Sequence, residues 1–290
     1  MMHTLVQELN TLCDPLPFHT GWYFKDLRSG DTADRHGHVV VPSASTRKIA
    51  IMMATLKAVN EGKLALDQPV TMQARYQNND SGCFQHLQPG FTIQLRDALV
   101  MMIIVSDNTC TGTVADLVGL EPINALSRAI GMQGTTHRYG IPPGGMAGYR
   151  PADATNATTP ADVGLLLELI LQGTHDTAAA ALLGCTPALC QLGLDILSWQ
   201  KHRNRLPSRL PLGTKVAHKT GTTAQNYNDA GIIYQNGEPL FILTAYTDRV
   251  PAELPDGTPG HTAANELIGR LCRVCYDTLC VQAPVGSRAH

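Results

Sequence analysis

One segment restricts the fold more than any other, the run TRKIAIMMATLKAV from Thr46 to Val59. Its apolar residues fall on nearly every side of a helix, whereas a surface helix carries a single apolar stripe. The run therefore predicts a helix that other elements bury on all sides, and Asn60, Glu61 and Gly62 end it. Ser45 stands at the start of this helix. Lys48 follows one turn later on the same face, so its amine can reach the Ser45 hydroxyl.

Enough apolar material is present to build a large core around this helix, since 43% of the 290 residues are hydrophobic and only 16% are charged. Apolar runs bounded by turn residues predict strands near both ends of the chain. The expected strands are Gly21–Asp26, His38–Val41, Lys215–Lys219, Ala230–Tyr234 and Leu240–Thr247, with turns at Arg28–Asp31 and Gln235–Glu238.

Helical patterns fill the region between these strands and also flank it. The expected helices are Met1–Asp14, Leu95–Val105, Thr109–Val118, Pro122–Ile130, Ala161–Leu171, Ala188–Trp199 and Ala263–Leu279. A long irregular loop, Gly131–Thr159, interrupts them, and such loops in compact domains are often functional. We predict an α/β (α+β) fold with an α/β lobe (residues 1–44 and 213–290), a mainly helical lobe (45–212) and a site in the groove between them.

The charge balance limits the possible partners. The chain has 22 basic and 24 acidic residues, a net charge of −2, so it lacks the basic face that nucleic acid needs. Its one basic cluster is interpreted as a solvated helix end, made by Lys201, His202, Arg203, Arg205 and Arg209. No membrane span and no secretory leader are recognisable. This predicts a cytoplasmic protein, or a periplasmic or secreted one if a leader has been removed.

The eight cysteines do not form the pattern of a zinc site. Cys272 and Cys275 make a CxxC pair in the expected last helix, but a zinc site needs a second pair at ligand spacing. Cys185 and Cys190 are too far apart in sequence to supply it. We interpret the cysteines as buried free thiols and predict neither a metal nor a cofactor.

Three short motifs follow one another along the chain, Ser45-Thr46-Arg47-Lys48 (S-x-x-K), Ser106-Asp107-Asn108 (S-D-N) and Lys219-Thr220-Gly221 (K-T-G). Each is weak alone, and the second by itself reads as a plain helix cap. S-x-x-K also occurs at Ser198–Lys201, near the end of a helix where no free N–H groups exist. Ser45 lies at a helix start, where free N–H groups can bind a developing oxyanion. The sequence therefore favours Ser45 as the nucleophile.

The residue types of the three motifs suit serine acyl transfer. A serine hydroxyl becomes a good nucleophile when a base takes its proton, and Lys48 can be that base if burial and the nearby Lys219 cation lower its pKa. Ser106 can then pass the proton to a leaving nitrogen. The expected substrate-binding residues are Asn108 for an amide, together with Thr220, Gly221 and Thr222 around a carboxylate.

These residues make the chain resemble the class A β-lactamase and penicillin-binding-protein family along most of its length. Beyond the motifs, the resemblance rests on Gln85–Gly90, Thr158–Pro160, Val216–Gly221 and Asn228–Gly231. It implies a β-lactamase/transpeptidase-like fold, with an antiparallel sheet flanked by helices and an all-helical lobe. It also implies an acyl-enzyme on Ser45 and an oxyanion hole made by the backbone N–H groups of Ser45 and Thr222.

The chain departs from the family in its long loop, called the omega loop. Class A β-lactamases carry Glu-Pro there, and the glutamate activates the water that clears the acyl-enzyme. Counting forward from Gly131 places Ile141-Pro142 at that point. The family's arginine just after the third strand is also missing, and Arg249 is a candidate to replace its charge.

Three interpretations of the missing glutamate stay open at this point. Asp153, His137 or Tyr139 activates water from another place in the loop; Lys48 serves both steps; or the acyl group passes to an acceptor other than water.

The sequence thus predicts a serine hydrolase that opens a β-lactam or related amide, with a small-molecule substrate that also carries a carboxylate. The alternative is a cytoplasmic amidase, esterase, peptidase or acyltransferase of the same fold with little β-lactamase activity. The missing leader favours this alternative, because penicillins and peptidoglycan are met outside the cytosol. A non-catalytic binding protein is disfavoured by the intact Ser45, Lys48, Ser106 and Lys219.

Overall fold

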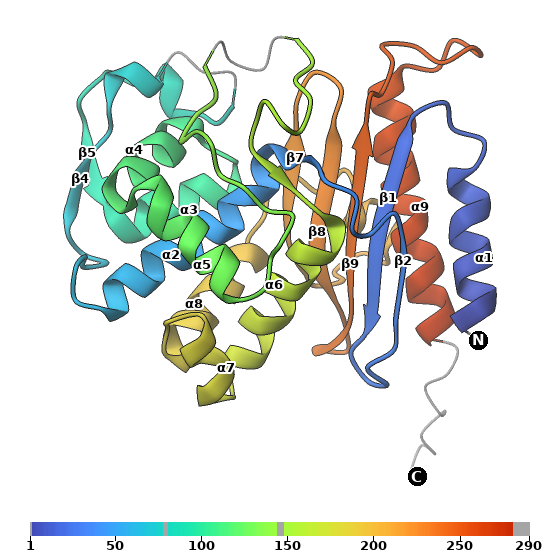
Figure 1. Cartoon of the computed structure of the whole chain (residues 1–290), viewed down its shortest axis with the longest axis horizontal. Helices are drawn as coiled ribbons and strands as arrows, with labels where there is room; N and C mark the ends of the chain where they lie inside the picture. The colour runs from blue at the N-terminus through green and yellow to red at the C-terminus, as the bar shows by residue number, and fades with distance from the viewer. Residues whose placement is uncertain (1, 78–80, 144–147, 281–290) are drawn as a thin grey trace.

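A five-stranded antiparallel sheet joins the two ends of the chain in the computed structural model, which describes residues 2–77, 81–143 and 148–280. The strands run in the order β2-β1-β9-β8-β7 (Figure 1). Their bounds are β1 (His19–Asp26), β2 (Thr32–Arg35), β7 (Val216–Thr222), β8 (Tyr227–Gln235) and β9 (Glu238–Asp248). Pairing of β1 with β9 from His19↔Asp248 to Asp26↔Phe241 links the N-terminal strands to the C-terminal ones.

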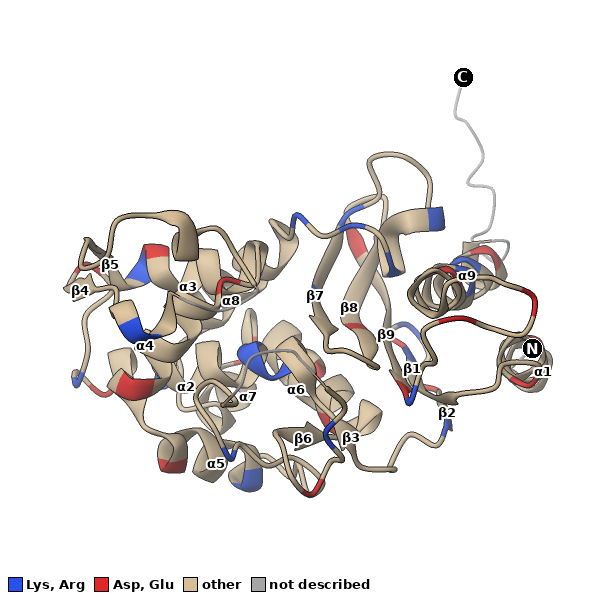
Figure 2. Cartoon of the chain, turned by 90° about the horizontal axis from the view of Figure 1, so that it is seen from above, with Lys and Arg blue, Asp and Glu red and all other residues tan. Residues whose placement is uncertain are grey.

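Helices cover both faces of this sheet, as the view from above shows (Figure 2). The terminal helices α1 (Met2–Cys13) and α9 (Gly260–Cys280) pack together on one face, over a core that contains Trp22, Phe24 and Phe241. Helix α6 (Pro160–Gly173) packs against β1, β8 and β9 on the other face. The sheet is therefore buried on two sides, which explains why β8 and β9 are apolar along most of their length.

A helical region is built around α2 (Lys48–Asn60), which contacts α3, α4, α5 and α8. Every residue from Lys48 to Leu56 is buried, as the all-round apolar pattern predicts. The other elements here are α3 (Leu95–Ile104), α4 (Asn108–Val118), α5 (Leu120–Ala129), α7 (Thr177–Leu182), α8 (Pro187–Ser198), the 3-10 helices η1 (Ala44–Arg47), η2 (Ala74–Tyr76), η3 (Phe84–His86) and η4 (Leu206–Arg209), and the short strands β3 (Val41–Pro42), β4 (Pro69–Thr71), β5 (Thr92–Gln94) and β6 (Ala157–Thr158). The division into two lobes stays a prediction.

Most expected elements are confirmed, but the second strand was placed wrongly. We expected it at His38–Val41, whereas β2 occupies Thr32–Arg35 and pairs with β1. Residues 38–40 form a turn that leads into β3. The two valines there, Val39 and Val40, are exposed, so their β-branched side chains misled the prediction.

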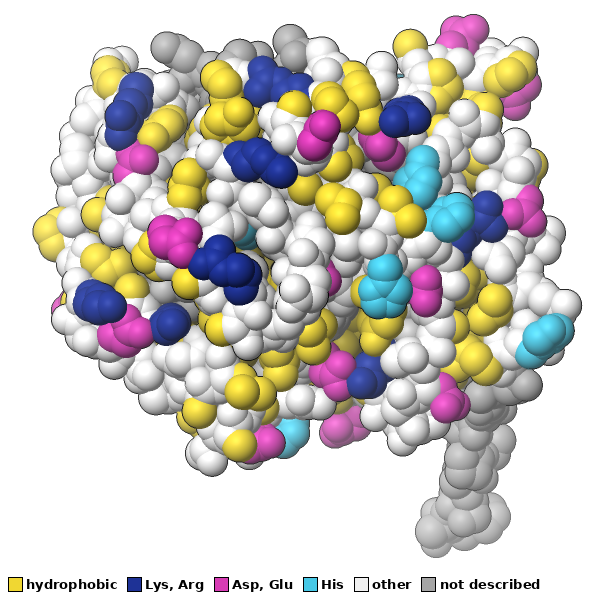
Figure 3. All heavy atoms as spheres, viewed as in Figure 1, with side chains coloured by type: hydrophobic (Ala, Val, Ile, Leu, Met, Phe, Trp, Pro, Cys, Tyr) yellow, Lys and Arg dark blue, Asp and Glu magenta, His cyan; other side chains and the backbone are white. Residues whose placement is uncertain are grey.

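The surface carries mixed charges. On the face shown in Figure 3, basic side chains lie scattered among acidic ones and do not form one patch. Across the described ranges, no helix combines the length and apolarity needed to cross a bilayer. The expected compartment and the expected absence of a nucleic-acid partner stay predictions.

Candidate active site

Ser45 lies on η1, a turn that continues directly into the buried helix α2. The residue before it, Ala44, is held at φ +47°, a left-handed conformation that non-glycine residues adopt rarely. Backbone N–H groups at such a helix start have no partner in the preceding turn. Ser45 is half-buried and lines a hollow in the surface, so its hydroxyl is reachable by a small molecule.

Strand β7 approaches this turn so closely that glycine fits best at residue 221. A Cβ atom on Gly221 would lie 3.0 Å from the backbone nitrogen of Ser45 and 3.1 Å from that of Thr46. Any side chain here would push β7 away from the turn, and Thr222 with it. Gly221, expected among the substrate-binding residues, thus sets the spacing between the two backbone segments.

Lys48 is fully buried one turn into the helix. Its Nζ donates to the backbone oxygen of Ser106 at 2.7 Å, to Ser106 Oγ at 3.1 Å and to Asn108 Oδ1 at 2.7 Å. Burial, helped by the nearby Lys219 and Arg47 cations, holds the pKa of Lys48 well below its usual value. The lowered pKa makes this amine, next to the Ser106 hydroxyl, a better proton acceptor than an exposed lysine.

The S-D-N motif connects α3 to α4, and its expected role as a helix cap is confirmed. Asp107 caps α4, because its side chain accepts from the N–H of Cys110 at 3.0 Å. Ser106 is held at φ +58°, and its backbone oxygen also accepts from Ser81 Oγ at 2.8 Å. The cap and the strained turn together aim the Ser106 hydroxyl at Lys48.

Lys219 lies fully buried in β7, and its Nζ donates to the backbone oxygen of Thr220 at 2.8 Å. Burial lowers the pKa of Lys219 to about 7; Asp229 opposes this shift and Arg205 adds to it. The side chain of Thr220 lines a second hollow together with Ser106. The K-T-G strand thus brings a cation and a hydroxyl to the side of Ser45 on which Ser106 lies.

The ladder between β7 and β8 fixes where the N–H of Thr222 points. The backbone N–H of Tyr234 donates to the backbone oxygen of Lys215, and the backbone N–H of Thr223 donates to that of Asn226. Because hydrogen-bonded pairs alternate along an antiparallel ladder, the odd-numbered residues of β7 are the ones whose backbone bonds to β8. The backbone N–H of Thr222 therefore points away from β8. Since β7 is the edge strand, this N–H projects outward from the edge of the sheet. This orientation agrees with the N–H pair of Ser45 and Thr222 that the family resemblance implies.

Arg205 is a site residue that the sequence analysis missed. We interpreted its cluster as a solvated helix end, and Lys201, His202, Arg203 and Arg209 are indeed exposed, but Arg205 is buried. Its guanidinium donates to the backbone oxygens of Gly221 and Asn228 at 2.7 and 2.6 Å, and to Thr222 Oγ1 at 2.6 Å. Arg205 therefore puts a positive charge next to β7. From the sequence, Arg249 was the candidate for that charge, which the family's missing arginine would supply.

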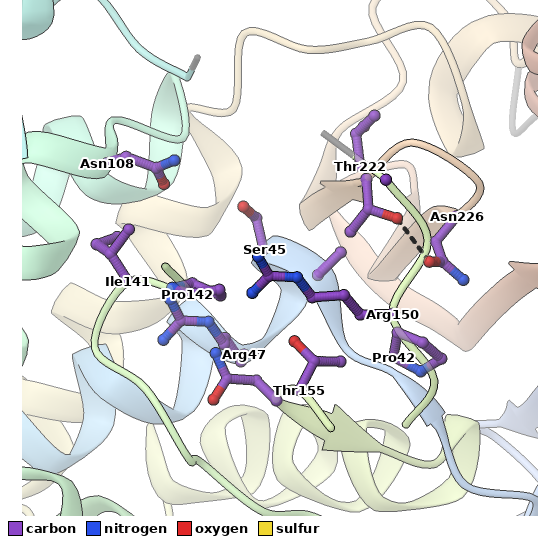
Figure 4. A pocket seen from close by; sticks show the side chains of 14 residues that line it. Pro42, Ser45, Arg47, Asn108, Ile141, Pro142, Arg150, Thr155, Thr222 and Asn226 are labelled. Atoms are coloured by element: carbon purple, nitrogen blue, oxygen red, sulfur yellow. Dashed lines mark hydrogen bonds between the residues drawn. The ribbon is translucent and has the colours of Figure 1, made fainter. Parts of the chain in front are cut away.

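Two hollows meet at Ser45. Ser45 and Thr222 line both of them. One hollow, which we call the relay hollow, also contains Ser81, Ser106, His202, Asn204, Arg205 and Thr220. The other, the loop hollow, is bounded by Asn108 and Ile141 on one side of Ser45 and by Thr222 and Asn226 on the other (Figure 4).

Ile141 and Pro142 line the loop hollow, as the count along the omega loop predicts. Asp153, a candidate to replace the missing glutamate, and Arg249, the candidate to replace the missing arginine, both lie elsewhere. Asp153 is exposed and lines a separate hollow with Gln133 and Arg138, and Arg249 is exposed beside Tyr149. Neither lines the loop hollow or the relay hollow.

His137 and Tyr139, the other loop candidates, do not line the loop hollow either. His137 is buried, and burial together with the Arg47 cation lowers its pKa to about 3. Its imidazole is therefore a very weak base. Of the candidates in the omega loop, Asp153, His137 and Tyr139, none lines the loop hollow where a water-activating base is needed.

The expected absence of a metal is not contradicted: across the described ranges, no group of three or more His, Cys, Asp or Glu side chains could hold a metal ion. All eight cysteines are free, and each belongs to the described part of the chain. Cys272 and Cys275 are buried in α9, and burial raises both pKa values. Cys83 is exposed, so the expectation of buried thiols fails for that residue.

The comparisons with known proteins agree with this geometry. A profile of the Beta-lactamase enzyme family matches residues 4–279. The chain belongs to this β-lactamase family. A β-lactamase of Bacteroides uniformis is 24% identical over 263 residues, covering 86% of this chain and 83% of that protein.

Solved structures place the chain in the same group. A leucine-to-glutamate mutant of PBP-A, an acyl-enzyme complex with penicillin G, is 28% identical with a TM-score of 0.80, covering 95% of this chain and 96% of that one. A β-lactamase from Sphaerobacter thermophilus has a TM-score of 0.81 at 24% identity, covering 97% and 98%. The β-lactamase/transpeptidase-like fold is thereby confirmed. The family and fold support serine hydrolase activity of the β-lactamase kind.

Proposed function

We propose that this member of the β-lactamase family takes the acyl group of a lactam or related amide onto Ser45 and releases it slowly. The observation that carries the proposal is the buried Lys48 amine, whose pKa is lowered by burial and which lies one turn from Ser45 and 3.1 Å from the Ser106 hydroxyl oxygen. This amine can take a proton from one hydroxyl and give it to the other.

Acylation then follows from the arrangement. Ser45 Oγ attacks the carbonyl carbon while Lys48 accepts the hydroxyl proton. The carbonyl oxygen gains negative charge, which the N–H groups of Ser45 and Thr222 stabilise. As the C–N bond breaks, Ser106 gives a proton to the leaving nitrogen and is reprotonated from Lys48. Because Ser106 lines the relay hollow, the leaving group occupies that hollow, where Thr220 and Arg205 suit a carboxylate and the buried Lys219 lies behind Thr220.

Release is expected to be slow because the loop hollow contains no general base. Ile141 stands where a carboxylate would activate water, and no carboxylate lines this hollow among the described residues. Lys48 is the remaining group that can activate water, and it also serves the first step. The omega-loop departure is thus an argument for a long-lived acyl-enzyme.

The proposal is tested by incubating the protein with benzylpenicillin and following intact mass and free product together. We expect an adduct of the full mass of the penicillin and slow hydrolysis. Ser45→Ala should remove both signals, whereas Ser198→Ala, at the other S-x-x-K sequence, should change neither. No adduct and no hydrolysis at millimolar penicillin would overturn the assignment to lactams. An adduct retained in Ser45→Ala would overturn the choice of nucleophile.

Replacing the omega-loop residue tests the slow step separately. Ile141→Glu should restore a water-activating carboxylate and shorten the lifetime of the adduct by about tenfold or more, since general-base catalysis contributes 10²–10⁴-fold when it is well placed. Ile141→Gln has nearly the same size and no basic group, so its adduct should persist. Equal lifetimes for the two variants would contradict the assigned role of position 141.

A second candidate, acyl transfer to an acceptor other than water, is favoured by the same absence of a base. An amine acceptor needs less activation than water because its unprotonated fraction, although small near neutral pH, is a much stronger nucleophile. Adding an amino acid or a primary amine to the preformed adduct should then release an amide of matching mass faster than water releases the acid. Release rates independent of the added amine would exclude this second function.

A further inference from the structure

The loop hollow must hold the acyl half of any substrate that reacts as proposed above. The leaving group lies with Ser106 in the relay hollow, and the two hollows share Ser45 and Thr222. A substrate whose carbonyl reaches Ser45 therefore extends its other half past Asn108 and Ile141 (Figure 4). The chemistry of the loop hollow consequently selects the acyl group.

Arg47 gives this hollow an uncompensated positive charge. The side chain lines the hollow and is only 6% exposed. Its Nη2 donates to the backbone oxygen of Gly140, but Nη1 has no hydrogen-bond partner, and no acidic side chain pairs with the group within the described ranges. Burial lowers the pKa of Arg47 to about 10, so the guanidinium remains charged at neutral pH. A charge in this position is costly unless something neutralises it.

Asn156 adds a second unpartnered donor to the same wall. It is 2% exposed and lines the hollow. Its Oδ1 accepts from the backbone N–H groups of Arg138 and Tyr139 at 2.7 and 3.0 Å, which identifies that atom as the oxygen. The remaining amide atom, Nδ2, must be a donor, and it has no partner among the described residues. Asn156 Nδ2, like Arg47 Nη1, is therefore a buried donor without an acceptor among the described residues.

Arg150, which is half-buried, is a second arginine in this hollow. It lines the hollow, and Figure 4 shows its side chain extending from the omega loop toward Ser45. Two arginines and several amide and hydroxyl side chains thus surround a hollow that no Asp or Glu lines within the described part of the chain.

We propose that the loop hollow is an anion subsite, in which Arg47, Arg150 and Asn156 bind a carboxylate on the acyl half of the substrate. This inference rests on the function proposed above and narrows its substrate class. The preferred substrate is an amide or lactam with two anionic groups, one on each side of the scissile bond. The first lies near Lys219 and Thr220, and the second lies in the loop hollow.

A purely structural role explains Arg47 less well. Arginines that hold a loop in place have their donors satisfied by carbonyl or carboxylate oxygens, as Arg205 does in this protein. Arg47 keeps one nitrogen unpaired beside the nucleophile. An ordered water can satisfy such a donor, but it cannot cancel the charge, whereas a carboxylate does both.

Two penicillins that differ by one carboxylate test the proposal. Carbenicillin is benzylpenicillin with an added carboxylate on the acyl side chain. We expect carbenicillin to acylate Ser45 about tenfold faster at low concentration, as a close charge pair of ordinary strength gives. Arg47→Met should abolish this preference and Arg150→Gln should reduce it. Arg128→Met removes an exposed arginine on α5 and should leave the preference unchanged.

A binding measurement separates this proposal from the proposed acylation. Malonate should raise the melting temperature of the Ser45→Ala protein, which cannot be acylated, and Arg47→Met should remove most of that rise. If no penicillin acylates the protein, the lactam assignment fails while this rise still supports the anion subsite. The anion subsite would be overturned if malonate raised the melting temperature equally with and without Arg47. It would also be overturned if both arginine variants kept the full preference for carbenicillin.

Discussion

Lys48 and Lys219 are both fully buried, yet the proposed reaction needs them in opposite protonation states. Lys48 must be neutral to accept a proton, and Lys219 must be charged to attract a carboxylate. Burial is the largest cause of a lowered pKa for both. The difference comes from the neighbours, because Asp229 raises the pKa of Lys219 while Lys219 and Arg47 further lower that of Lys48. Lys219 thus retains its proton up to about pH 7, whereas the neighbouring cations favour the neutral form of Lys48.

The pH profile of acylation should report this pair. We expect kcat/KM for a penicillin to rise with pH as Lys48 loses its proton and to fall above about pH 7, where Lys219 becomes neutral. The fall should approach tenfold per pH unit at most, since one proton is lost. The measurement is the rate of adduct formation between pH 5 and about pH 9, at a substrate concentration well below KM.

A matched pair of esters isolates the alkaline limb. An ester whose leaving group carries a carboxylate should lose reactivity above about pH 7, and the same ester without that carboxylate should not. A flat profile for the carboxylate substrate from pH 7 to 9 would contradict the role given to Lys219.

The residues proposed to react could be selected from the sequence more readily than the residues that surround them. Ser45, Lys48 and Ser106 follow from short spacings on local helix starts. Arg205 was missed because its burial depends on where the segment between α8 and β7 folds back against β7, and the cluster around it is exposed. Asp153 was considered because it is the loop's one carboxylate, but which side of an irregular loop faces the site depends on tertiary contacts.

At the scale of elements, the start of α4 connects catalysis to stability. Asp107 is fully buried; one carboxylate oxygen caps the helix at the N–H of Cys110, and the other accepts from the N–H of Phe84 at 2.8 Å. The segment before the motif is therefore tied to the helix that positions Ser106.

Replacing the Asp107 cap should lower both the stability of the fold and the rate of acylation. Asp107→Ala should lower the free energy of unfolding by roughly 2–4 kcal/mol, since it removes a helix cap and leaves a buried N–H without a partner. It should also slow acylation strongly, because the Ser106 turn loses its support. Urea unfolding and the rate of adduct formation measure the two effects.

Asp176→Ala is the matched control, since Asp176 caps α7 far along the chain from the motifs. We expect a loss of about 1 kcal/mol and an unchanged acylation rate. If Asp107→Ala acylates as fast as the native chain does, the turn does not depend on this cap.

Elements with strong periodicity were predictable and short polar ones were not. Helix α2 is apolar on all sides and could be recognised from sequence alone. Strand β2 (Thr-Ala-Asp-Arg) forms by pairing with β1 at the sheet edge and has no apolar alternation of its own. Helix α7 is a six-residue, alanine-rich segment whose burial rests on packing against α6, so its sequence shows no amphipathic repeat.

At the scale of the whole molecule, the site exists because α2 and β7, which come from distant parts of the chain, bury basic side chains, which are costly in their charged forms, against each other. Lys48, Lys219, Arg47 and Arg205 are each less than 10% exposed. Such charges oppose folding unless each is well partnered. The fold therefore carries a stability cost at its centre that the proposed reaction requires.

Lys219→Met should reveal that cost. The pKa of Lys219 is about 7 in the folded protein and near its usual value of 10.5 in the unfolded chain. The unfolded state therefore binds an extra proton between these values, so native stability rises with pH from about 7 to 10.5, and the cost is complete below about pH 7. At pH 6 the variant should be more stable on the order of a few kcal/mol, and this gain should shrink toward pH 10. Urea unfolding across this range measures it, with the exposed Lys63→Met as the control whose effect should not vary in this way. A constant difference, or a less stable variant at pH 6, would show that the Lys219 charge does not oppose folding.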